Sequence, residues 1–278
     1  MLRIILSFFG GVFTFLTMSV VAFALTIGAV FWIYGRDLPS HESLAQYKPP
    51  TISRIYSGEG RIVDEFARER RLFTGAKDVP ILIKQAFISA EDKNFYSHPG
   101  YDLRGILSAA VDAARSGGRR VRGASTITQQ VMKNFLLDGS RRAERKIKEI
   151  ILATRIENTL DKERILELYL NEIFLGQNSY GVTAAAQTYF NKTLDELAPH
   201  EAAFLASLPK APSDFHPVRR KQRLLDRRNY VLKEMWQNGF LEEAAYRAEA
   251  AQPLLSVQNG DFKSFRSALP RRGYFSDE

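Results

Sequence analysis

The sequence predicts a mainly α-helical domain that carries a small N-terminal β-hairpin and is preceded by one transmembrane helix. Three observations lead to this prediction: a long uncharged run near the N-terminus, one short alternating apolar pattern, and helical apolar periodicity over most of the remaining chain. The 278 residues are 45% hydrophobic and 25% charged, which is typical of a folded protein and argues against wholesale disorder.

The first element is an apolar run without any charged residue, from residue 4 to residue 34. As a helix it would be about 46 Å long, whereas the hydrocarbon core of a bilayer is about 30 Å thick. A cleaved signal peptide has an apolar core of only about 7–15 residues, so we interpret residues 1–36 as an uncleaved transmembrane anchor. The positions of Arg3 and Arg36 weakly favour a cytoplasmic N-terminus.

Charge and composition narrow the class of partner. Residues 37–278 carry 37 Lys and Arg against 31 Asp and Glu, a net charge of +6. A basic domain tethered beside a bilayer suggests anionic headgroups or a phosphorylated lipid as partner. Nucleic acid is the other usual partner of a basic domain, but the anchor argues against it. The chain has no cysteine, which excludes disulfides and thiolate metal sites.

The rest of the chain divides into a linker, a hairpin and a series of helices. Residues 37–50 are polar and end in Pro-Pro, so we interpret them as a linker. Residues 51–66 alternate around Ser-Gly-Glu-Gly and predict a hairpin. Periodicity and capping signals then predict helices that lead into Glu91, cover 103–114, begin after Thr126, Ser140 and Asp161, and cover 182–190, 196–208, 219–237 and 241–250.

Glu91 and Asp92 begin the most informative segment, Glu-Asp-Lys-Asn-Phe-Tyr-Ser-His-Pro-Gly, which ends at Gly100. Adjacent acids are usually a solvated helix end. Here the preceding helix is apolar and Pro99-Gly100 turns the chain sharply. A carboxyl group at the mouth of an apolar cleft can have a raised pKa, which suits proton transfer.

Two further segments have plain interpretations from their residues alone. Residues 123–130, Gly-Ala-Ser-Thr-Ile-Thr-Gln-Gln, predict a flexible loop and a helix N-terminus, whose free backbone N–H groups favour a phosphate; simple capping by Ser125 or Thr126 is compatible with this. Residues 145–149, Arg-Lys-Ile-Lys-Glu, predict a surface ion-pair stripe on an amphipathic helix.

These three segments, followed by Ile-Leu-Glu-Leu-Tyr-Leu-Asn at 165–171, resemble in order and spacing the peptidoglycan glycosyltransferase domain of class A penicillin-binding proteins and their monofunctional relatives (glycosyltransferase family 51). The resemblance covers roughly residues 50 to 245. It implies a lysozyme-like, mostly α fold for a domain placed at 51–250. It also implies that Glu91 is the catalytic base, that Glu149 is a second acid, and that Arg145 and Lys146 bind a diphosphate, which needs fixed cations to stabilise its charge. The substrate-binding residues that it implies are Asp92, Phe95, His98, Ser125, Thr126, Gln130, Lys133, Asn134, Arg145 and Lys146.

The activity implied by the resemblance is inverting polymerisation of lipid II into β-1,4-linked glycan strands, with release of undecaprenyl diphosphate. It implies no metal-binding residue and no required cofactor, with a divalent cation (Mg²⁺ or Mn²⁺) at Glu149 as an option. The implied location is the periplasmic side of the inner membrane. The implied partners are lipid II, the growing lipid-linked glycan, the membrane, and cell-wall synthesis or division proteins including transpeptidases.

Other segments receive plainer interpretations. Residues 117–122 are rich in glycine and arginine, and we interpret them as a mobile lid over the cleft. Glu167 and Asn171 receive a structural role, and residues 205–212 a packing role. The basic residues of 219–228 predict a solvated helix face, with lipid headgroup contact as the alternative.

The C-terminal part departs from the class A pattern. A transpeptidase needs a Ser-x-x-Lys nucleophile and a Lys-Thr-Gly strand. We identify no such nucleophile, and Lys192-Thr193 is followed by Leu194, so we predict no penicillin binding for these residues. We interpret 251–278 as a linker towards an absent transpeptidase domain. Two other functions stay open: a hydrolase or lytic transglycosylase that uses Glu91 as an acid, and an inactive membrane scaffold.

Overall fold

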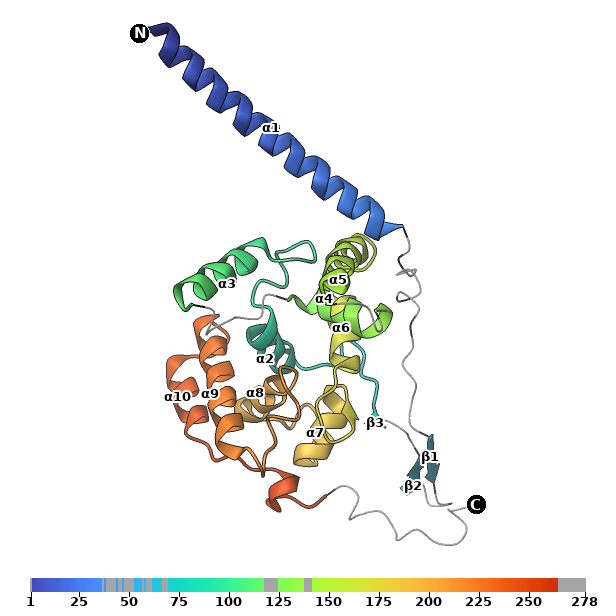
Figure 1. The fold of residues 1–278 in the computed structure, drawn as a ribbon. Coiled ribbons are helices and arrows are strands. Elements are labelled where there is room, and N and C mark those ends of the chain that lie inside the picture. Colours follow the sequence, from blue (N-terminus) through green and yellow to red (C-terminus); the bar gives the residue numbers. More distant parts are fainter. Residues whose placement is uncertain are drawn as a thin grey trace.

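The computed structural model of the chain describes residues 2–36, 38, 44, 47, 53–56, 58, 62–66, 70–117, 125–137 and 142–264. Its most prominent element is α1 (Leu2–Gly35), a helix that projects from a compact group of helices (Figure 1). Residues Ser7–Gly35 have a mean hydropathy of 2.1, none of that window is buried, and in length and composition the helix could cross a membrane. The predicted N-terminal apolar helix is therefore confirmed.

Four hydroxyl groups within α1 are satisfied inside the helix. Thr14, Thr17, Ser19 and Thr26 each donate a hydrogen bond to the carbonyl oxygen four residues earlier, at 2.8–2.9 Å. In hydrocarbon an unpaired hydroxyl is costly, so this local pairing makes these polar residues compatible with a lipid environment.

Strands are few and short in the part of the chain that the structure describes. β1 (Ser53–Tyr56) pairs antiparallel with β2 (Ile62–Phe66), which confirms the predicted hairpin. β3 (Arg70–Arg71) pairs parallel with β4 (Ser179–Tyr180). Two residues of the predicted linker pack on the helices: Leu44 is 3% exposed, and the Tyr47 hydroxyl donates to Glu172 Oε1 at 2.8 Å.

The helices follow the predicted series closely. They are α2 (Ile81–Glu91), α3 (Leu103–Arg115), α4 (Ile127–Leu136), α5 (Arg142–Glu157), α6 (Lys162–Glu172), α7 (Val182–Phe190), α8 (Pro199–Ser207), α9 (Lys221–Gln237) and α10 (Glu243–Ala250). The 3₁₀ helix η2 (Val257–Asn259) follows. The predicted caps are confirmed for Thr126, which accepts from the backbone N–H of Gln129, and for Asp161, which accepts from that of Arg164. The mainly helical fold class is thus confirmed.

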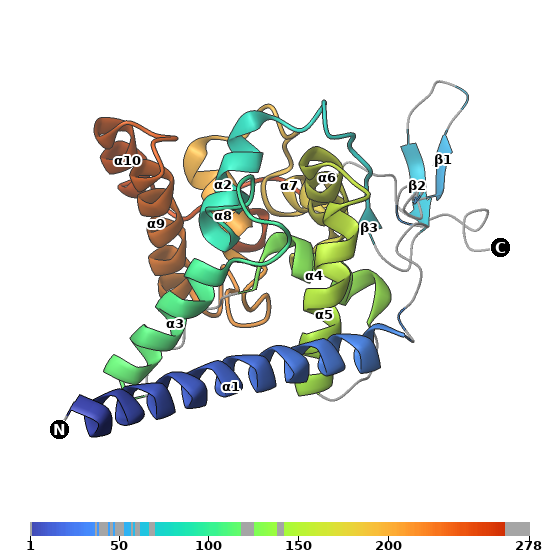
Figure 2. The same ribbon diagram turned by 90° about the horizontal axis from the view of Figure 1, so that it is seen from above.

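Two central helices, α2 and α8, organise the core and position the candidate site. Ile83, Ala86 and Phe87 on α2 are fully buried, as the apolar face leading into Glu91 predicts. α2 packs on α8 and α9, and the α4–α5–α6 group lies on its other side (Figures 1 and 2). The buried face of α2 therefore fixes its C-terminal residue between these two groups.

Structural roles are confirmed for Glu167 and Asn171 on α6. The Asn171 side chain accepts from the backbone N–H of Thr74 and donates to the Thr74 carbonyl, both at 2.9 Å. Glu167 accepts from the backbone N–H of Ala76 at 2.6 Å. Both side chains thus supply hydrogen bonds to the segment that precedes α2.

The apolar face of α3 is not buried. Leu103 and Leu107 are 66% and 67% exposed, and Ile106 and Val111 are also exposed. Figures 1 and 2 place α3 on the side of the domain where α1 lies. The helix itself forms as predicted, capped by Asp102, which accepts from the backbone N–H of Gly105 at 2.9 Å.

Candidate active site

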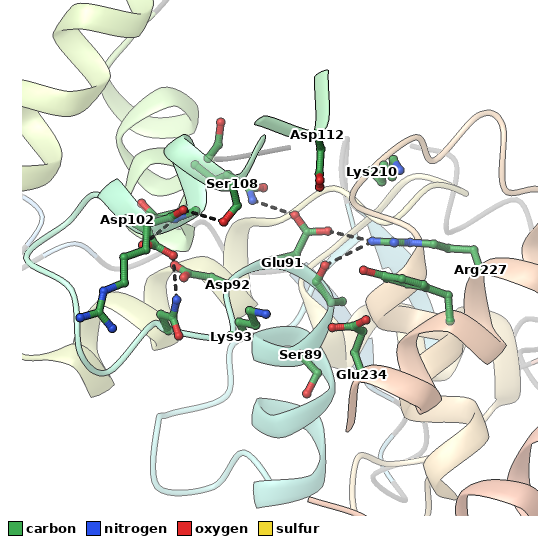
Figure 3. A pocket seen from close by; sticks show the side chains of 18 of the residues that line it. Ser89, Glu91, Asp92, Lys93, Asp102, Ser108, Asp112, Lys210, Arg227 and Glu234 are labelled. Atoms are coloured by element: carbon green, nitrogen blue, oxygen red, sulfur yellow. Dashed lines mark hydrogen bonds and ion pairs between the residues drawn. The ribbon is translucent and has the colours of Figure 1, made fainter. Parts of the chain in front are cut away.

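A cleft of about 1350 Å³ opens at the C-terminal end of α2 (Figure 3). α3, the N-terminus of α4 and α9 contribute its other walls. Five of the predicted site residues line it: Glu91, Asp92, Ser125, Thr126 and Gln130. The structure therefore brings together residues from two motifs that are separated by more than thirty positions in the sequence.

Glu91 is the last residue of α2, and its side chain is only 13% exposed. Gln130 Nε2 donates to Glu91 Oε2 at 2.8 Å, and Arg227 Nη2 lies 3.8 Å from Oε1. Burial raises the pKa of Glu91 above its ordinary value, while the Gln130 hydrogen bond and the cations of Arg227 and Lys210 oppose part of that rise. A carboxyl group with a raised pKa, open to a cleft, is suited to accept a proton from a bound hydroxyl.

Asp92 and His98 form a buried pair beneath Glu91. Asp92 Oδ2 lies 2.8 Å from His98 Nε2 and accepts from the backbone N–H of Ile127 at 2.9 Å. The backbone N–H of Gly100 donates to His98 Nδ1 at 3.1 Å. Because Nδ1 accepts, Nε2 carries the proton and donates to Asp92. The pair thus joins the loop after α2 to the start of α4.

Two backbone N–H groups at the N-terminus of α4 already donate to side chains of the protein. Asp92 accepts from the N–H of Ile127, the first helical residue, and the Thr126 hydroxyl oxygen accepts from that of Gln129 at 3.1 Å. The capping interpretation is therefore confirmed. The expectation of free N–H groups for a phosphate is wrong for these two donors, because the carboxylate of Asp92 occupies the favourable anion position.

Phe95 is fully buried and does not line the cleft. Its ring contacts Tyr96 and His98 edge-on, and Lys162 Nζ lies 4.7 Å from the ring centroid. Lys162 also donates to the His98 carbonyl oxygen at 2.7 Å. Phe95 therefore shapes the loop that carries Asp92 and His98.

The second predicted acid, Glu149, lies on α5 behind Ser125. Its side chain is 7% exposed, and Oε1 lies 3.5 Å from Arg145 Nε. Lys146 Nζ donates to Glu149 Oε2 at 3.1 Å, to Ser125 Oγ at 2.7 Å and to Gln129 Oε1 at 2.9 Å. One buried carboxylate thus holds two partly exposed cations, which leaves a net positive cluster next to the cleft wall.

Lys133 and Asn134 are exposed on α4 and are not among the residues that line the cleft. Most of the predicted lid, residues 118–122, lies outside the described residues.

Sequence reasoning missed two basic residues beside Glu91. Arg227 and Lys210 both line the cleft, although they were interpreted as part of a solvated face and of a packing segment. Arg228 is 1% exposed and donates to the carbonyl oxygens of Ala250 and Pro253, so the solvated-face interpretation is wrong for it too. The signal was present, because Arg228 falls on the same stripe as buried Leu224, Val231 and Leu232.

A Ser-x-x-Lys spacing occurs at Ser207–Lys210, which the sequence reasoning also missed. Ser207 is fully buried at the end of α8 and donates to the Ala203 carbonyl oxygen at 2.7 Å. Because this hydroxyl cannot reach a substrate, the spacing is not a transpeptidase nucleophile.

The chain is similar to known proteins over most of its length. The profile of a protein family described as Transglycosylase matches residues 59–236. Penicillin-binding protein 1A from Rickettsia felis is 46% identical over 248 residues, which cover 87% of this chain and 31% of that protein. Penicillin-binding protein 1A from Aquifex aeolicus is 41% identical over 245 residues, which cover 87% of this chain and 34% of that protein. A crystal structure of penicillin-binding protein 1A from Haemophilus influenzae matches with a TM-score of 0.42 and 28% identity, over 76% of this chain and 22% of that one.

The chain belongs to the transglycosylase family, which confirms the predicted class of protein. It spans about a third of the length of the curated relatives that it matches. The matched residues lie within the predicted domain of 51–250, whose boundaries stay a prediction.

Proposed function

We propose that this chain is a membrane-anchored, inverting peptidoglycan glycosyltransferase that polymerises lipid II. The observation that carries the proposal is the buried Glu91 carboxyl group, which faces the cleft with a raised pKa and is contacted by Gln130. Family membership supplies the reaction class, and the cleft supplies room for a large substrate.

In the proposed reaction Glu91 takes the proton from the 4-hydroxyl of the acceptor lipid II. The freed oxygen attacks the anomeric carbon of the donor from the face opposite its diphosphate. A β-1,4 bond forms, the bond to undecaprenyl diphosphate breaks, and the carbon inverts. The proton rests on Glu91 and returns to solvent before the next cycle.

Arg145, Lys146 and Lys133 are proposed to stabilise the phosphates of the leaving group. Lys146 already uses three donor contacts, to Ser125, Gln129 and Glu149. Binding a phosphate at Lys146 would therefore exchange one protein acceptor for a phosphate oxygen. We propose that Ser125 is the acceptor that the phosphate replaces, because Ser125 also lines the cleft.

A divalent cation at Glu149 does not fit the residues that the structure describes. Glu149 is engaged by Arg145 and Lys146, and the described residues contain no group of three His, Asp or Glu that could hold a metal ion. In the proposed mechanism Glu91, Arg145, Lys146 and Lys133 therefore act as side chains without a bound metal.

We propose that α1 spans the inner membrane and that the helical domain lies on its periplasmic side. The exposed leucines of α3, on the side where α1 lies, support contact of that face with the same bilayer. This placement brings the cleft close to lipid-linked substrates. The proposed partners are lipid II, the lipid-linked glycan and other cell-wall synthesis or division proteins, including transpeptidases.

The test is polymerisation of lipid II by the detergent-solubilised full chain, with products separated on a gel. We expect glycan ladders from the wild type and a loss of about 10²- to 10⁴-fold in Glu91→Gln. Glu149→Gln should also lose the ladders. Glu243→Gln, at an exposed position of α10 outside the cleft, serves as the control and should keep them.

A folded wild type that binds lipid II but forms no product would overturn the enzyme proposal for this chain. The hydrolase alternative is tested separately, with purified cell walls. A fall in their turbidity that depends on Glu91 would favour cleavage over polymerisation.

A further inference from the structure

A second cavity, of about 450 Å³, lies where the C-terminal end of α1 meets α5. Its walls are Phe31, Trp32, Gly35 and Arg36 from α1 and the segment after it, with Ile151, Thr154 and Arg155 from α5. Figure 2 shows α1 crossing α5 at this point. None of these residues lines the cleft at Glu91, so the cavity is separate from the candidate active site.

Two arginines converge on this cavity and each is held in place. Arg155 Nη2 donates to the Gly35 carbonyl oxygen at 3.0 Å. A Cβ atom at Gly35 would lie 3.1 Å from that nitrogen, so glycine permits the close approach. The Arg36 guanidinium lies 4.1 Å from the centroid of the Trp32 ring. Within the described part of the chain, no carboxylate pairs with either arginine.

The position of the cavity relative to the bilayer indicates which class of ligand it can bind. The apolar span Ser7–Gly35 is about 44 Å long, longer than a hydrocarbon core of about 30 Å, so its last turns reach the headgroup level. Trp32 is typical of that level. Phe31 and Trp32 are largely exposed, which leaves an apolar wall beside the two cations. A cavity with one cationic and one apolar side matches a phosphate attached to an acyl chain.

We propose that this cavity binds the headgroup phosphate of an anionic phospholipid. The phosphate lies between Arg36 and Arg155, and an acyl chain lies along Phe31 and Trp32. A lipid held there joins the anchor to α5, the helix that also carries Lys146 and Glu149. The inference rests on the proposed membrane-spanning role of α1 but not on the polymerisation reaction.

The test uses Trp32 as a local reporter in the full chain. Trp236→Phe removes the other tryptophan, and the protein is reconstituted in phosphatidylcholine vesicles. Brominated phosphatidylglycerol or brominated phosphatidylcholine is then added at equal mole fraction, and quenching of Trp32 is compared. We expect stronger quenching by the brominated phosphatidylglycerol. The lipid preference should fall about fivefold for each arginine replaced in Arg36→Gln and Arg155→Gln.

Matched variants separate this site from general charge effects. Lys233→Gln with Arg247→Gln removes two positive charges from α9 and α10, and the preference should stay unchanged. Arg36→Lys with Arg155→Lys keeps the charges and should retain most of the preference. Circular dichroism confirms that each variant keeps its helices.

Several outcomes would overturn the proposal. Equal quenching by the two lipids would show that α1 lies in the bilayer without an anionic lipid site. No quenching by either lipid would show that α1 is not in the bilayer, which also removes the proposed anchor. Relief of quenching by traces of undecaprenyl diphosphate would assign the cavity to the lipid substrate instead of a phospholipid.

Discussion

Arg227 Nη2 lies 3.8 Å from Glu91 Oε1 and donates to the carbonyl oxygen of Ala90, the residue before Glu91. The guanidinium also lies 4.8 Å from the centroid of the Tyr230 ring. These contacts hold a cation beside the proposed catalytic base, where it opposes part of the rise that burial causes in the pKa of Glu91. Arg227 is therefore a positioning residue that sets the proton affinity of Glu91.

Replacing Arg227 should change the pH dependence of polymerisation more than its maximum. In Arg227→Gln the pKa of Glu91 rises further, because a stabilising cation is lost and burial remains. A general base must be ionised, so the acidic limb of the pH profile of kcat/KM should shift to higher pH. Activity should be most reduced at low pH and should recover as pH rises.

Two variants make this prediction specific to the charge at Arg227. Arg227→Lys keeps the cation and should restore most of the wild-type limb. Arg223→Gln removes another arginine of α9 that lines the cleft but pairs with Asp214 at 3.4 Å, and it should leave the limb in place. A limb that stays fixed in Arg227→Gln, with activity reduced equally at every pH, would indicate a purely structural role.

The stability of the fold should also depend on the protonation of Glu91. Because its pKa is raised in the folded state, the folded state binds the proton more tightly than the unfolded chain. This contribution to stability is fully present below the ordinary pKa of 4.5 and is lost as pH rises through the raised pKa of the folded state. At neutral pH the ionised Glu91 therefore destabilises the fold.

Glu91→Gln should remove this dependence. Thermal unfolding of the variant and the wild type, compared from pH 4 to pH 8, should give similar Tm values at the acidic end. The variant should become the more stable of the two as pH rises. A difference in Tm that shrinks with rising pH would contradict the raised pKa.

Local sequence signals predicted the helices and the position of Glu91 well. Thr126 and Asp161 cap the helices that were predicted to begin after them. Such caps can be predicted from sequence because they involve only residues within one turn of the helix start. The buried stripe of Ile83, Ala86 and Phe87 placed Glu91 at the end of α2, since a helix turns a fixed angle per residue.

The contacts that define the chemistry depend on residues far apart in the chain. Arg227 reaches Glu91 only because α9 packs on α2, and a run of basic residues on a helix does not indicate which member turns inward. Asp92 caps α4 from 35 positions earlier, which no local capping rule predicts. The apolar face of α3 has the same periodicity as a buried one, so periodicity alone could not show that the described residues leave it exposed.

Removing the Asp92 side chain should destabilise the domain strongly. Asp92→Ala loses the hydrogen bonds from His98 and from the backbone N–H of Ile127, both in a buried site, at a cost of about 3 kcal/mol. Asp92→Asn retains an acceptor oxygen but loses the charge at the N-terminus of α4, at a cost of about 1 kcal/mol.

The measurement is the free energy of unfolding in urea at pH 7.5. Asp226→Ala, which removes an exposed acid of α9 bonded to Gln222, should change it by about 0.5 kcal/mol or less. Equal, small effects of Asp92→Ala and Asp226→Ala would show that the buried pair does not hold the loop after α2 to α4.

The last prediction separates the structural role of Lys146 from its proposed contact with phosphate. The Glu149 side chain is nearly buried, and Lys146→Met removes one of its two cationic partners. Arg145 is then its remaining ion-pair partner among the residues that the structure describes. Because Lys146 is itself partly exposed, we expect a cost of about 1–2 kcal/mol in the free energy of unfolding. Adding Glu149→Gln removes the buried charge that has lost one of its two cations and should recover most of that loss.

Polymerisation activity is measured in the Lys146→Met single variant, because Glu149→Gln alone is expected to abolish the glycan ladders. If Lys146 holds a phosphate oxygen in the reaction, this variant stays inactive at temperatures where it is fully folded. Lys148→Met with Glu144→Gln is the matched control, because it removes an i,i+4 ion pair from the same helix, with its charged atoms 2.7 Å apart. The Lys148–Glu144 pair should contribute only about 0.5 kcal/mol to the free energy of unfolding, and its removal should leave activity intact. Full glycan ladders from folded Lys146→Met would show that Lys146 only neutralises Glu149.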